Sequence, residues 1–229
     1  MILKSFKWAL IFDNMKKILV FALMIPLFCA AQAPTDTVSL DEGNFHTAWS
    51  HSAKYPIKVY WHLTADMLDC PNPNGRNERN FGSDPQLPNE TQLNSDYAKS
   101  GYDRGHNFDA ADDKCSSPET YLHCWYFTNM TPQTPHLNRI TWAGLEAQCR
   151  KWVKGGDELF IECGSYGKAK TSGLDSVWVP EFCWKIVKHK NGEIDCYLMP
   201  NTSDVNQYPF TYYHTDLALI ERKTGLANL

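Results

Sequence analysis

Hydrophobic and polar residues alternate along parts of the chain with the period of a β-strand. Between Ile57 and Leu63 every second residue is apolar, which predicts a strand with one buried face. Trp125 to Thr128 is a short aromatic run, and Glu158 to Cys163 is a short run with an apolar centre; both also favour a strand. We therefore expect a strand in each of these three segments.

A hairpin is predicted in the second half of the chain. Val177 to Lys190 and Glu193 to Met199 are both rich in strand-forming residues, and they flank the dipeptide Asn191-Gly192. Asn-Gly favours the two-residue turn that joins antiparallel strands, because both of its residues tolerate positive φ. We expect the two segments to pair.

Helical periodicity occurs twice. From Asn138 to Val153, one helical face carries Trp142, Leu145, Cys149, Trp152 and Val153, and Gly155-Gly156 follows as a stop signal. Near the C-terminus, Thr215 can cap a helix that runs to Lys223 and ends at Gly225. Strands outnumber helices but are mixed with them, so the predicted fold class is α+β.

Residues 34–229 are interpreted as one domain, because no repeat, low-complexity tract or linker divides them. Asp69 to Pro88 is rich in Asn, Pro, Gly and Asp, which predicts a long irregular loop. A loop of that length inside a compact domain is usually functional.

The N-terminus has the pattern of a secretory signal peptide over residues 1–33. An apolar run from Ile18 to Ala31 follows Lys16-Lys17 and precedes a small-x-small cleavage site that ends at Ala33. Met15 is a better start for this signal than Met1. The run is too short for a membrane span, so we expect a mature protein that is secreted or periplasmic and has no membrane segment.

Composition and charge narrow the function classes. The chain is 43% hydrophobic and 21% charged, which excludes a disordered, collagen-like or coiled-coil protein. Removing residues 1–33 leaves 18 basic and 25 acidic residues, a net charge of -7. This is not the global charge of a nucleic-acid-binding protein, so a polyanion would have to be bound locally, by a few cations such as Arg79, Arg104, Arg139 and Arg150.

Candidate chemistry lies between residues 102 and 150. His106 follows Arg104 at the end of a non-helical segment, where it could act as a general base near a bound anion, although a lone histidine is more often a surface or core residue. Asn138 is at a helix N-terminus, where an asparagine is usually a cap. Glu146 and Arg150 lie on one side of that helix, and such a pair is usually an exposed i,i+4 ion pair.

Together these residues resemble the DNA/RNA non-specific endonucleases, a sugar-non-specific family whose active site is a ββα-metal finger. The resemblance rests on Asp103-Arg104-Gly105-His106, on Thr128-Asn129-Met130-Thr131-Pro132-Gln133, and on Asn138 followed by Trp142, Leu145 and Glu146. It extends to Arg79-Asn80-Phe81 and to residues 221–226. Thr128, where a serine is common, and the acidic net charge are departures. The resemblance implies a central antiparallel sheet flanked by helices, with the finger embedded at residues 103–153.

The resemblance also implies the roles of the site residues. His106 would activate water, and Asn138 would be the single direct protein ligand of Mg²⁺ or another divalent cation such as Mn²⁺. Water would fill the other metal positions, which suits the octahedral oxygen coordination of magnesium. Glu146 would hold metal-bound water, and Asn129 would support the site.

Three arginines are assigned to substrate phosphate. Arg79 and Arg104 match arginines with that role in the family, and Arg150 follows Glu146 as a neighbour. Asp103 is assigned to structure. Because metal and base would touch only phosphate and water, nothing in the set reads a base edge or a 2′-hydroxyl.

The predicted function is therefore an exported, metal-dependent endonuclease that cuts DNA and RNA and leaves 5′-phosphate and 3′-hydroxyl ends. The sequence does not indicate an inhibitor protein or an oligomeric state.

One alternative function is a secreted, inactive binding module on the same fold that stacks Trp49, Trp61, Trp125 and Trp178 on nucleic acid or glycan. Another is a phosphodiesterase for nucleotides or cofactors, which would need a closed pocket. The complete set of His106, Asn138 and Glu146 argues against an inactive module.

Export also determines how the cysteines are interpreted. In an oxidising compartment cysteines usually form disulfides, and an odd number leaves at least one unpaired. We expect two or three disulfides, with Cys115 to Cys124 as a local pair on the finger. His123 and these two cysteines lack the second half of a zinc site. Seven cysteines follow residue 33: Cys70, Cys115, Cys124, Cys149, Cys163, Cys183 and Cys196.

Overall fold

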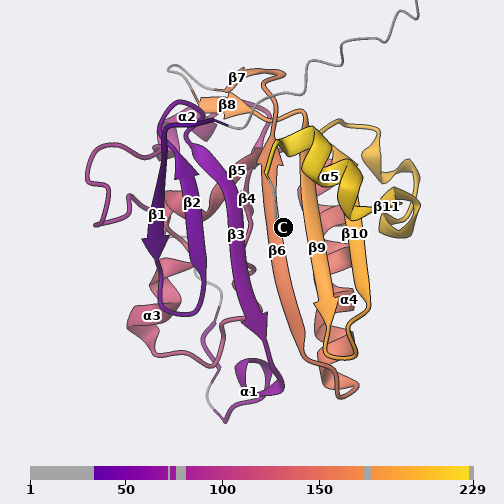
Figure 1. The fold of residues 1–229 in the computed structure, drawn as a ribbon. Helices are drawn as coiled ribbons and strands as arrows, with labels where there is room; N and C mark the ends of the chain where they lie inside the picture. The colour runs from indigo at the N-terminus through magenta and orange to yellow at the C-terminus, as the bar shows by residue number, and fades with distance from the viewer. Residues whose placement is uncertain (1–33, 72, 76–80, 173–176, 227–229) are drawn as a thin grey trace, which may run out of the picture.

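The structure is a computed structural model that describes residues 34–71, 73–75, 81–172 and 177–226. The predicted signal peptide, the start at Met15 and the predicted phosphate contact Arg79 lie outside the described residues. Within them, seven antiparallel strands form the main sheet, in the order β1-β2-β3-β6-β9-β10-β11 (Figure 1). The strands are β1 (Thr37–Asp41), β2 (His46–Ser50), β3 (Tyr55–Leu63), β6 (Leu159–Tyr166), β9 (Phe182–His189), β10 (Ile194–Pro200) and β11 (His214–Thr215).

The remaining elements are short, apart from the helix α4. Two small two-stranded sheets pair β4 with β5 and β7 with β8. Their strands are β4 (Asp103–His106), β5 (Met130–Gln133), β7 (Lys170–Ser172) and β8 (Val177–Val179). The α-helices are α1 (Ala65–Leu68), α2 (Asn94–Tyr97), α3 (Pro118–His123), α4 (Ala143–Lys154) and α5 (Leu217–Thr224). The other helical turns are η2 (Phe127–Asn129), η3 (Leu137–Trp142), η4 (Val205–Gln207) and η5 (Phe210–Tyr213).

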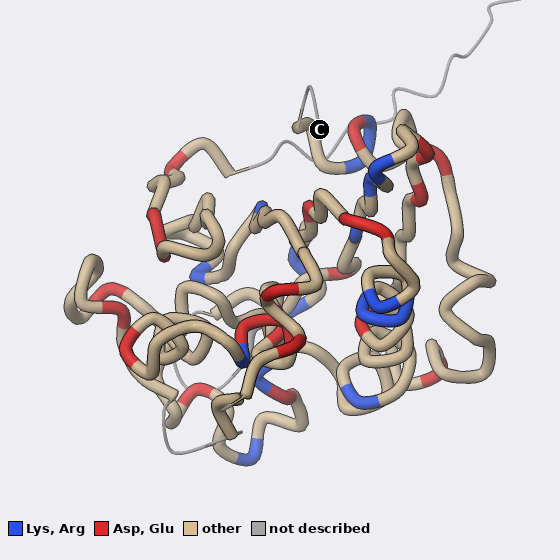
Figure 2. The backbone as a smooth tube through the Cα atoms, turned by 90° about the horizontal axis from the view of Figure 1, so that it is seen from below, with Lys and Arg blue, Asp and Glu red and all other residues tan. Residues whose placement is uncertain are grey.

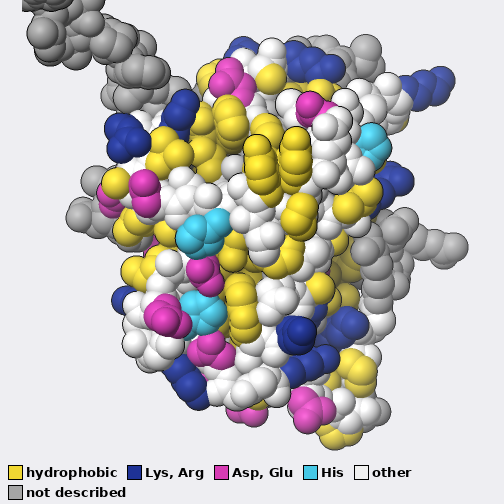
Figure 3. Space-filling model, turned by 90° about the vertical axis from the view of Figure 1, so that its right-hand side faces the viewer, with side chains coloured by type: hydrophobic (Ala, Val, Ile, Leu, Met, Phe, Trp, Pro, Cys, Tyr) yellow, Lys and Arg dark blue, Asp and Glu magenta, His cyan; other side chains and the backbone are white. Residues whose placement is uncertain are grey.

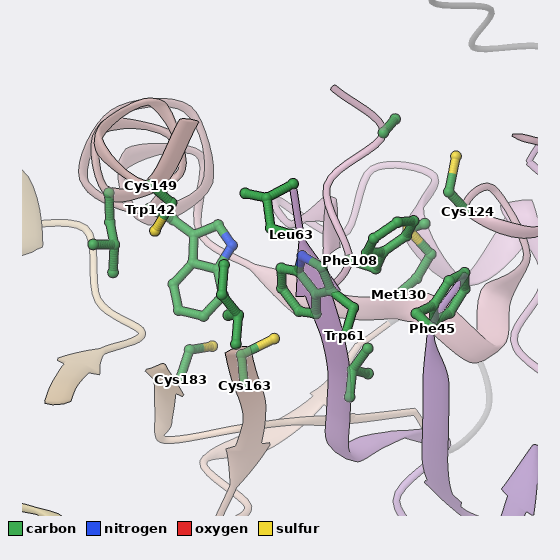
Figure 4. Packing of buried hydrophobic residues seen from close by; sticks show 14 of the residues in the cluster. Phe45, Trp61, Leu63, Phe108, Cys124, Met130, Trp142, Cys149, Cys163 and Cys183 are labelled. Atoms are coloured by element: carbon green, nitrogen blue, oxygen red, sulfur yellow. The ribbon is translucent and has the colours of Figure 1, made fainter. Parts of the chain in front are cut away.

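The main sheet is covered on both faces. The helix α4 lies behind the sheet in Figure 1, and α5 crosses β9 and β10 in front of it. The larger core lies on the α4 side, where aromatic rings pack among the thiols of Cys149, Cys163 and Cys183 (Figure 4). A smaller cluster around Trp184 and Ile220 lies under α5. The predicted α+β fold with a central antiparallel sheet is confirmed.

The strands β4 and β5 and the helix α4 form the predicted ββα unit. Asp103 pairs with Gln133, and His106 pairs with Met130. At Gly105 a Cβ atom would collide with the Gln133 side chain, so the pairing needs glycine there. The segment η3 then leads into α4. This unit brings residues 103–106 next to the helix that carries Asn138 and Glu146.

The loop that precedes the ββα unit is attached to it by a buried hydroxyl. Thr128 Oγ1 donates a hydrogen bond of 2.8 Å to the Asp84 carboxylate, and both residues are fully buried. A serine hydroxyl could make the same bond, so a threonine at this position is compatible with the buried contact.

Two predicted strands differ from the observed ones. Residues 125–128 form a turn and the start of η2, and the strand begins only at Met130, because the Asn129 side chain binds the backbone of Cys124 and Phe108 and turns the chain there. The predicted strand at 177–190 is divided into β8 and β9 at Pro180, which has no N–H for a strand ladder. The β9–β10 hairpin is confirmed, with Gly192 at φ 90°.

The two predicted helices are confirmed with changes at their first turns. The first turn of the long helix is the π-helical segment η3, and α4 follows it. At the C-terminal helix the N-cap is Asp216 rather than Thr215, because the Asp216 side chain accepts the 2.6 Å hydrogen bond from Leu219 N. Gly225 ends that helix with φ 70°, as predicted.

The predicted cysteine pairing is wrong. Among the described residues, a single disulfide joins Cys70 to Cys115, and Cys124 is a buried thiol whose Sγ contacts Tyr121 O at 2.9 Å. The loop reaches Cys115 because Asn74 donates to the carbonyls on both sides of it, Lys114 O and Ser116 O. The unpaired thiols are buried and pack as small hydrophobic residues: Cys124, Cys149, Cys163, Cys183 and Cys196. The prediction of two or three disulfides is therefore wrong, and that of at least one free thiol is confirmed.

Two surface features complete the description. None of the helices in the described part of the chain is long and apolar enough to cross a membrane. On the face drawn in Figure 3, hydrophobic side chains gather in the upper half of the molecule. In the segment that carries η4 and η5, Tyr208 and Tyr212 stack with ring centroids 4.1 Å apart, and both are exposed.

Candidate active site

A cleft of about 650 Å³ lies between the β4–β5 pair and the helical segment formed by η3 and α4. Its lining is mostly charged or polar. In Figure 2, Lys and Arg positions are interspersed with Asp and Glu positions along the described backbone. The cleft is lined by Phe81, Asp103, Arg104, His106, Asp109, Asn138, Arg139, Ala143 and Glu146.

His106 ends β4 at the wall of this cleft. Its imidazole lies edge-on to the Trp125 ring, with centroids 4.9 Å apart, and 5.6 Å from the ring of Phe81. The carbonyl of His106 accepts a 3.2 Å hydrogen bond from Trp142 Nε1 on η3. Side-chain packing and this backbone contact together restrict where the imidazole can lie.

Asn138 is the second residue of η3, and its side chain is oriented by β4. Its Nδ2 donates a 3.0 Å hydrogen bond to Asp103 Oδ2. Because the amide nitrogen is used in this way, the amide oxygen remains the group that Asn138 can offer to a ligand in the cleft.

Asp103 also binds Arg139. The guanidinium donates from Nε and Nη2 to the two carboxylate oxygens, each at 2.7 Å. Burial works to raise the pKa of Asp103, but the hydrogen bonds from Arg139 and Asn138 hold it below its usual value. A carboxylate at residue 103 therefore positions both an amide and an arginine, in agreement with its predicted structural role.

Arg104 lines the cleft, as expected for a phosphate contact. Its guanidinium lies 4.3 Å from the centroid of the Phe81 ring, and Nη1 donates a 2.7 Å hydrogen bond to Asn94 Oδ1. A cation stacked on an aromatic ring is held in one orientation. Arg104 is thus a preorganised cation at the cleft.

Glu146 lines the cleft from α4, one turn after Trp142. Its Oε1 lies 3.9 Å from Nζ of Lys185, a buried lysine on β9. Burial and the charge of Asp109 raise the pKa of Glu146 well above its usual value, while Lys185 and Arg150 oppose that shift. The pKa of Lys185 is raised in turn, because the Glu146 carboxylate outweighs the effect of burial.

Arg150 is not among the residues that line the cleft. Its guanidinium contacts the carboxylate of Asp109 and lies 3.1 Å from Asp112 Oδ1. Burial works to raise the pKa of both aspartates, but Arg150 holds the pKa of Asp109 below its usual value. Burial and the Asp109 charge raise the pKa of Asp112 to about 7. This placement indicates that Arg150 neutralises two aspartates rather than contacting substrate phosphate.

Asn129 lies behind the cleft and is fully buried. Its Nδ2 donates to Phe108 O at 2.9 Å and Cys124 O at 2.8 Å, and its Oδ1 accepts from Phe108 N at 2.8 Å. Every polar atom of the side chain is used in joining two backbone segments. This fits the predicted supporting role and indicates no contact with substrate.

The structure adds three residues to the predicted set, Phe81, Asp109 and Lys185. Arg139, expected from the sequence as one of the cations that bind a polyanion, does line the cleft. Phe81 lies in a segment that the family resemblance includes. Asp109 and Lys185 carry no local sequence signal, because only the packing of other segments brings them to the site.

The side chains at the cleft fit a hard, oxygen-liganded cation. Asn138 offers an amide oxygen, and within the described residues no hydrogen-bond donor reaches the buried Oε1 of Glu146. Amide and carboxylate oxygens are the ligands that Mg²⁺ prefers, and Mg²⁺ usually keeps several waters. No three His, Cys, Asp or Glu side chains of the described ranges are grouped as ligands for a metal ion.

The sequence matches known nucleases. A model of the DNA/RNA non-specific endonuclease family matches residues 28–228. A nuclease of Nostoc sp. is 39% identical over 154 residues, which cover 66% of this chain and 54% of that protein. Nuclease C1 of Cunninghamella echinulata is 29% identical over 183 residues, 72% of each chain. Mitochondrial endonuclease G of Bos taurus is 31% identical over 58% of this chain and 50% of its own.

The chain thus spans about half the length of the Nostoc and bovine relatives. The fold also matches a solved structure, the crystal structure of the EndoG/EndoGI complex, with a TM-score of 0.70. The match covers 82% of this chain and 84% of the other at 24% sequence identity. It supports the overall fold described above.

Proposed function

The chain belongs to the DNA/RNA non-specific endonuclease family, and from this we propose that it hydrolyses phosphodiester bonds of DNA and RNA without sequence specificity. One observation carries the proposal: a single cleft contains His106 from β4, Asn138 from η3 and Glu146 from α4. These three side chains supply a general base and oxygen ligands for a cation. An endonuclease of this family needs both.

His106 is the general base of the proposed reaction. Its imidazole takes a proton from water, and the water oxygen forms a bond to phosphorus as the bond from phosphorus to the 3′ oxygen breaks. The leaving 3′ oxygen takes up a proton from solvent, so the products are a 5′-phosphate and a 3′-hydroxyl. Packing against Trp125 and Phe81 limits the positions of the imidazole, which reduces the entropy lost on reaching the reactive arrangement.

The cations of the cleft bind the phosphate. Arg104 is held on the Phe81 ring, and Arg139 is held by Asp103. Negative charge grows on the phosphate oxygens in the transition state, so arginines fixed before the substrate arrives stabilise it without reorganising.

Asn138 and, through water, Glu146 would hold a divalent cation, with Mg²⁺ as the proposed metal. Such a cation supplies Lewis-acid stabilisation of the phosphate charge. Asp103 orients the Asn138 amide for this role through the 3.0 Å hydrogen bond.

An inactive binding module is the competing function, and the burial of its expected stacking residues argues against it. Trp49, Trp61 and Trp125 are at most 4% exposed and belong to the core. Trp178 is partly buried beneath the ammonium of Lys168, 4.4 Å from its ring centroid. These tryptophans do not form an exposed stacking surface.

Export to an oxidising compartment is part of the proposal. The signal-like pattern at residues 1–33 and the disulfide between Cys70 and Cys115 support it. The bovine relative is described as mitochondrial, so the location needs its own test. Fractionation of the native host, followed by N-terminal sequencing of the mature protein, would provide it.

The activity is tested with purified protein on supercoiled plasmid and on structured RNA, each with Mg²⁺, with Mn²⁺ or with chelator. We expect both substrates to be cut with a divalent cation and neither with chelator. His106→Ala is the control for a contaminating nuclease. If neither substrate is cut with either metal, the proposal fails and the binding module replaces it.

A further inference from the structure

Lys185 is a charged residue inside the main core. It lies on β9, faces the α4 side of the sheet and is only 1% exposed. Its Nζ lies 4.3 Å from the centroid of the Trp142 ring and 5.5 Å from that of Trp61. Lysines are almost never fully buried unless they are paired with an opposite charge, so this position needs an explanation beyond packing.

The ammonium touches the two helix residues that organise the cleft. Trp142 and Glu146 are four residues apart and therefore lie on one side of the helical segment. Trp142 Nε1 donates to the carbonyl of His106 at 3.2 Å, and Glu146 faces the cleft. Lys185 thus contacts Trp142, which holds the His106 backbone. It also contacts the carboxylate of Glu146.

Charge balance gives a second reason for a lysine here. Three carboxylates lie together behind and beside the cleft, on Asp109, Asp112 and Glu146. Two cations face them. Arg150 contacts both aspartates, and Lys185 is the cation within ion-pair distance of Glu146. Without the Lys185 ammonium, the Glu146 carboxylate would lie near the two aspartates with no ion-pair partner among the described residues for its own charge.

We propose that Lys185 is a positioning residue of the cleft, whose ammonium holds the Glu146 carboxylate and the Trp142 indole in the arrangement that cation binding requires. The inference rests on the proposed function, because it assigns Lys185 an action on that same site. Lys185 is not among the residues that line the cleft. It acts through Glu146 and Trp142.

A role in packing alone would have different consequences. A buried ion pair can often be replaced by hydrophobic residues of similar volume without loss of stability. Methionine matches much of the lysine side chain in length and flexibility. If Lys185 only fills space, Lys185→Met leaves cation binding and turnover as they are. If Lys185 positions Glu146, the same change impairs both in a folded protein.

The experiment compares four variants with the parent: Lys185→Met, Glu146→Gln, the double variant, and Lys188→Met as the matched control. Lys188 is on the same strand, but its side chain is exposed on the opposite face. Plasmid cleavage is measured across a magnesium titration, and Mg²⁺ binding to the apoprotein is measured by calorimetry. Thermal unfolding reports whether each variant is folded.

For Lys185→Met we expect at least a tenfold lower kcat, a weaker Mg²⁺ affinity and a KM for plasmid within twofold of the parent. Lys188→Met should match the parent in all three. If Lys185 acts through Glu146, adding Lys185→Met to Glu146→Gln should cause little further loss, because coupled residues are not additive. Lys185→Gln, which keeps a polar side chain, replaces the methionine variant in the same comparison if that variant does not fold.

Two results would overturn the inference. One is a folded Lys185 variant whose kcat and Mg²⁺ affinity stay within twofold of the parent. The other is a double variant in which the two losses multiply in full. Failure of the proposed function is a separate result, because the parent itself would then cut no nucleic acid, while calorimetry would still show whether Lys185 affects cation binding.

Discussion

The side-chain amide of Asn138 donates a 3.0 Å hydrogen bond to the carboxylate of Asp103, which joins η3 to β4 across 35 positions of sequence. The same carboxylate binds Arg139 through two further hydrogen bonds. One aspartate therefore orients a candidate metal ligand and a candidate phosphate contact. The geometry of the cleft depends on this carboxylate, although Asp103 itself carries no catalytic role.

Asp103→Ala should raise the magnesium concentration for half-maximal cleavage by about 10- to 100-fold, the usual cost of removing a group that orients a metal ligand. The reason is that the Asn138 amide loses the acceptor that sets its orientation. A magnesium titration of plasmid cleavage measures the shift. Asp66→Ala, which changes an exposed carboxylate, is the control, and an equal shift in both variants would contradict the assignment.

His106→Ala should lower turnover by about 10²- to 10⁴-fold, the usual contribution of a general base. Binding of Mg²⁺ and of uncleaved nucleic acid should stay close to that of the parent, because the imidazole only removes a proton from water. Single-turnover cleavage and calorimetry separate the two effects. Recovery of activity at high magnesium would show that His106 acts on the metal instead.

Asn138→Ala should respond to magnesium in the opposite way. Loss of the proposed direct ligand weakens cation affinity, so part of the activity should return as the magnesium concentration rises. Calorimetric titration of the apoprotein measures the affinity. Normal Mg²⁺ binding by this variant would mean that the metal lies on other residues.

Cleavage should depend only weakly on salt. Arg104 and Arg139 line the cleft together with Asp103, Asp109 and Glu146, so few phosphates can be neutralised there. We expect a log-log slope of binding against salt concentration that is shallower than about -6, measured with a non-cleavable substrate. A steeper slope would contradict this expectation and indicate that a basic groove binds the nucleic acid.

The disulfide between Cys70 and Cys115 should contribute roughly 3–4 kcal/mol to the free energy of unfolding, because it closes a loop of 45 residues. Urea unfolding of Cys70→Ser/Cys115→Ser against the parent measures this contribution. In protein that begins at residue 34, thiol counting under denaturing, non-reducing conditions should find five free thiols. A count of three free thiols, or of one, would show that one or two further disulfides form.

The stability of the protein should depend on pH through His189. Nδ1 of this buried histidine lies 2.6 Å from Asp157 and Nε2 lies 3.2 Å from Asp195. Asp195 also contacts His214 at 3.0 Å. Burial works to lower the pKa of His189, but the two carboxylates raise it above its usual value.

Because the folded state binds the His189 proton more tightly than the unfolded state, the added stability is complete below about pH 6.5 and disappears as pH rises through the raised pKa. His189→Asn should therefore lower Tm more at pH 6 than at pH 9. Thermal unfolding at both values measures the difference, with exposed His51→Asn as the control. A loss in Tm that is the same at both pH values would contradict this linkage.

Patterns formed by neighbouring residues in the sequence were sufficient to predict many of the strands and helices. The alternation from Ile57 to Leu63 predicted β3, and Asn191-Gly192 predicted the β9–β10 hairpin. Two strand predictions were wrong for different reasons. Pro180 ends one strand early because it has no N–H, a local signal that the sequence already contains. The buried Asn129 side chain turns the chain where a strand was expected, through contacts with other segments that local pattern does not reveal.

By itself, the sequence determined which residues could do the chemistry, because His106, Asn138 and Glu146 occur at the spacing of one known motif. Only the tertiary structure decided which charges surround them. The contacts of Arg150 with Asp112 and of Glu146 with Lys185 join segments that have no shared pattern along the chain. Packing of the sheet against α4 creates these contacts. The same packing separates the thiols that remain unpaired. The reason is that a side chain buried in a core can meet only the residues that pack against it.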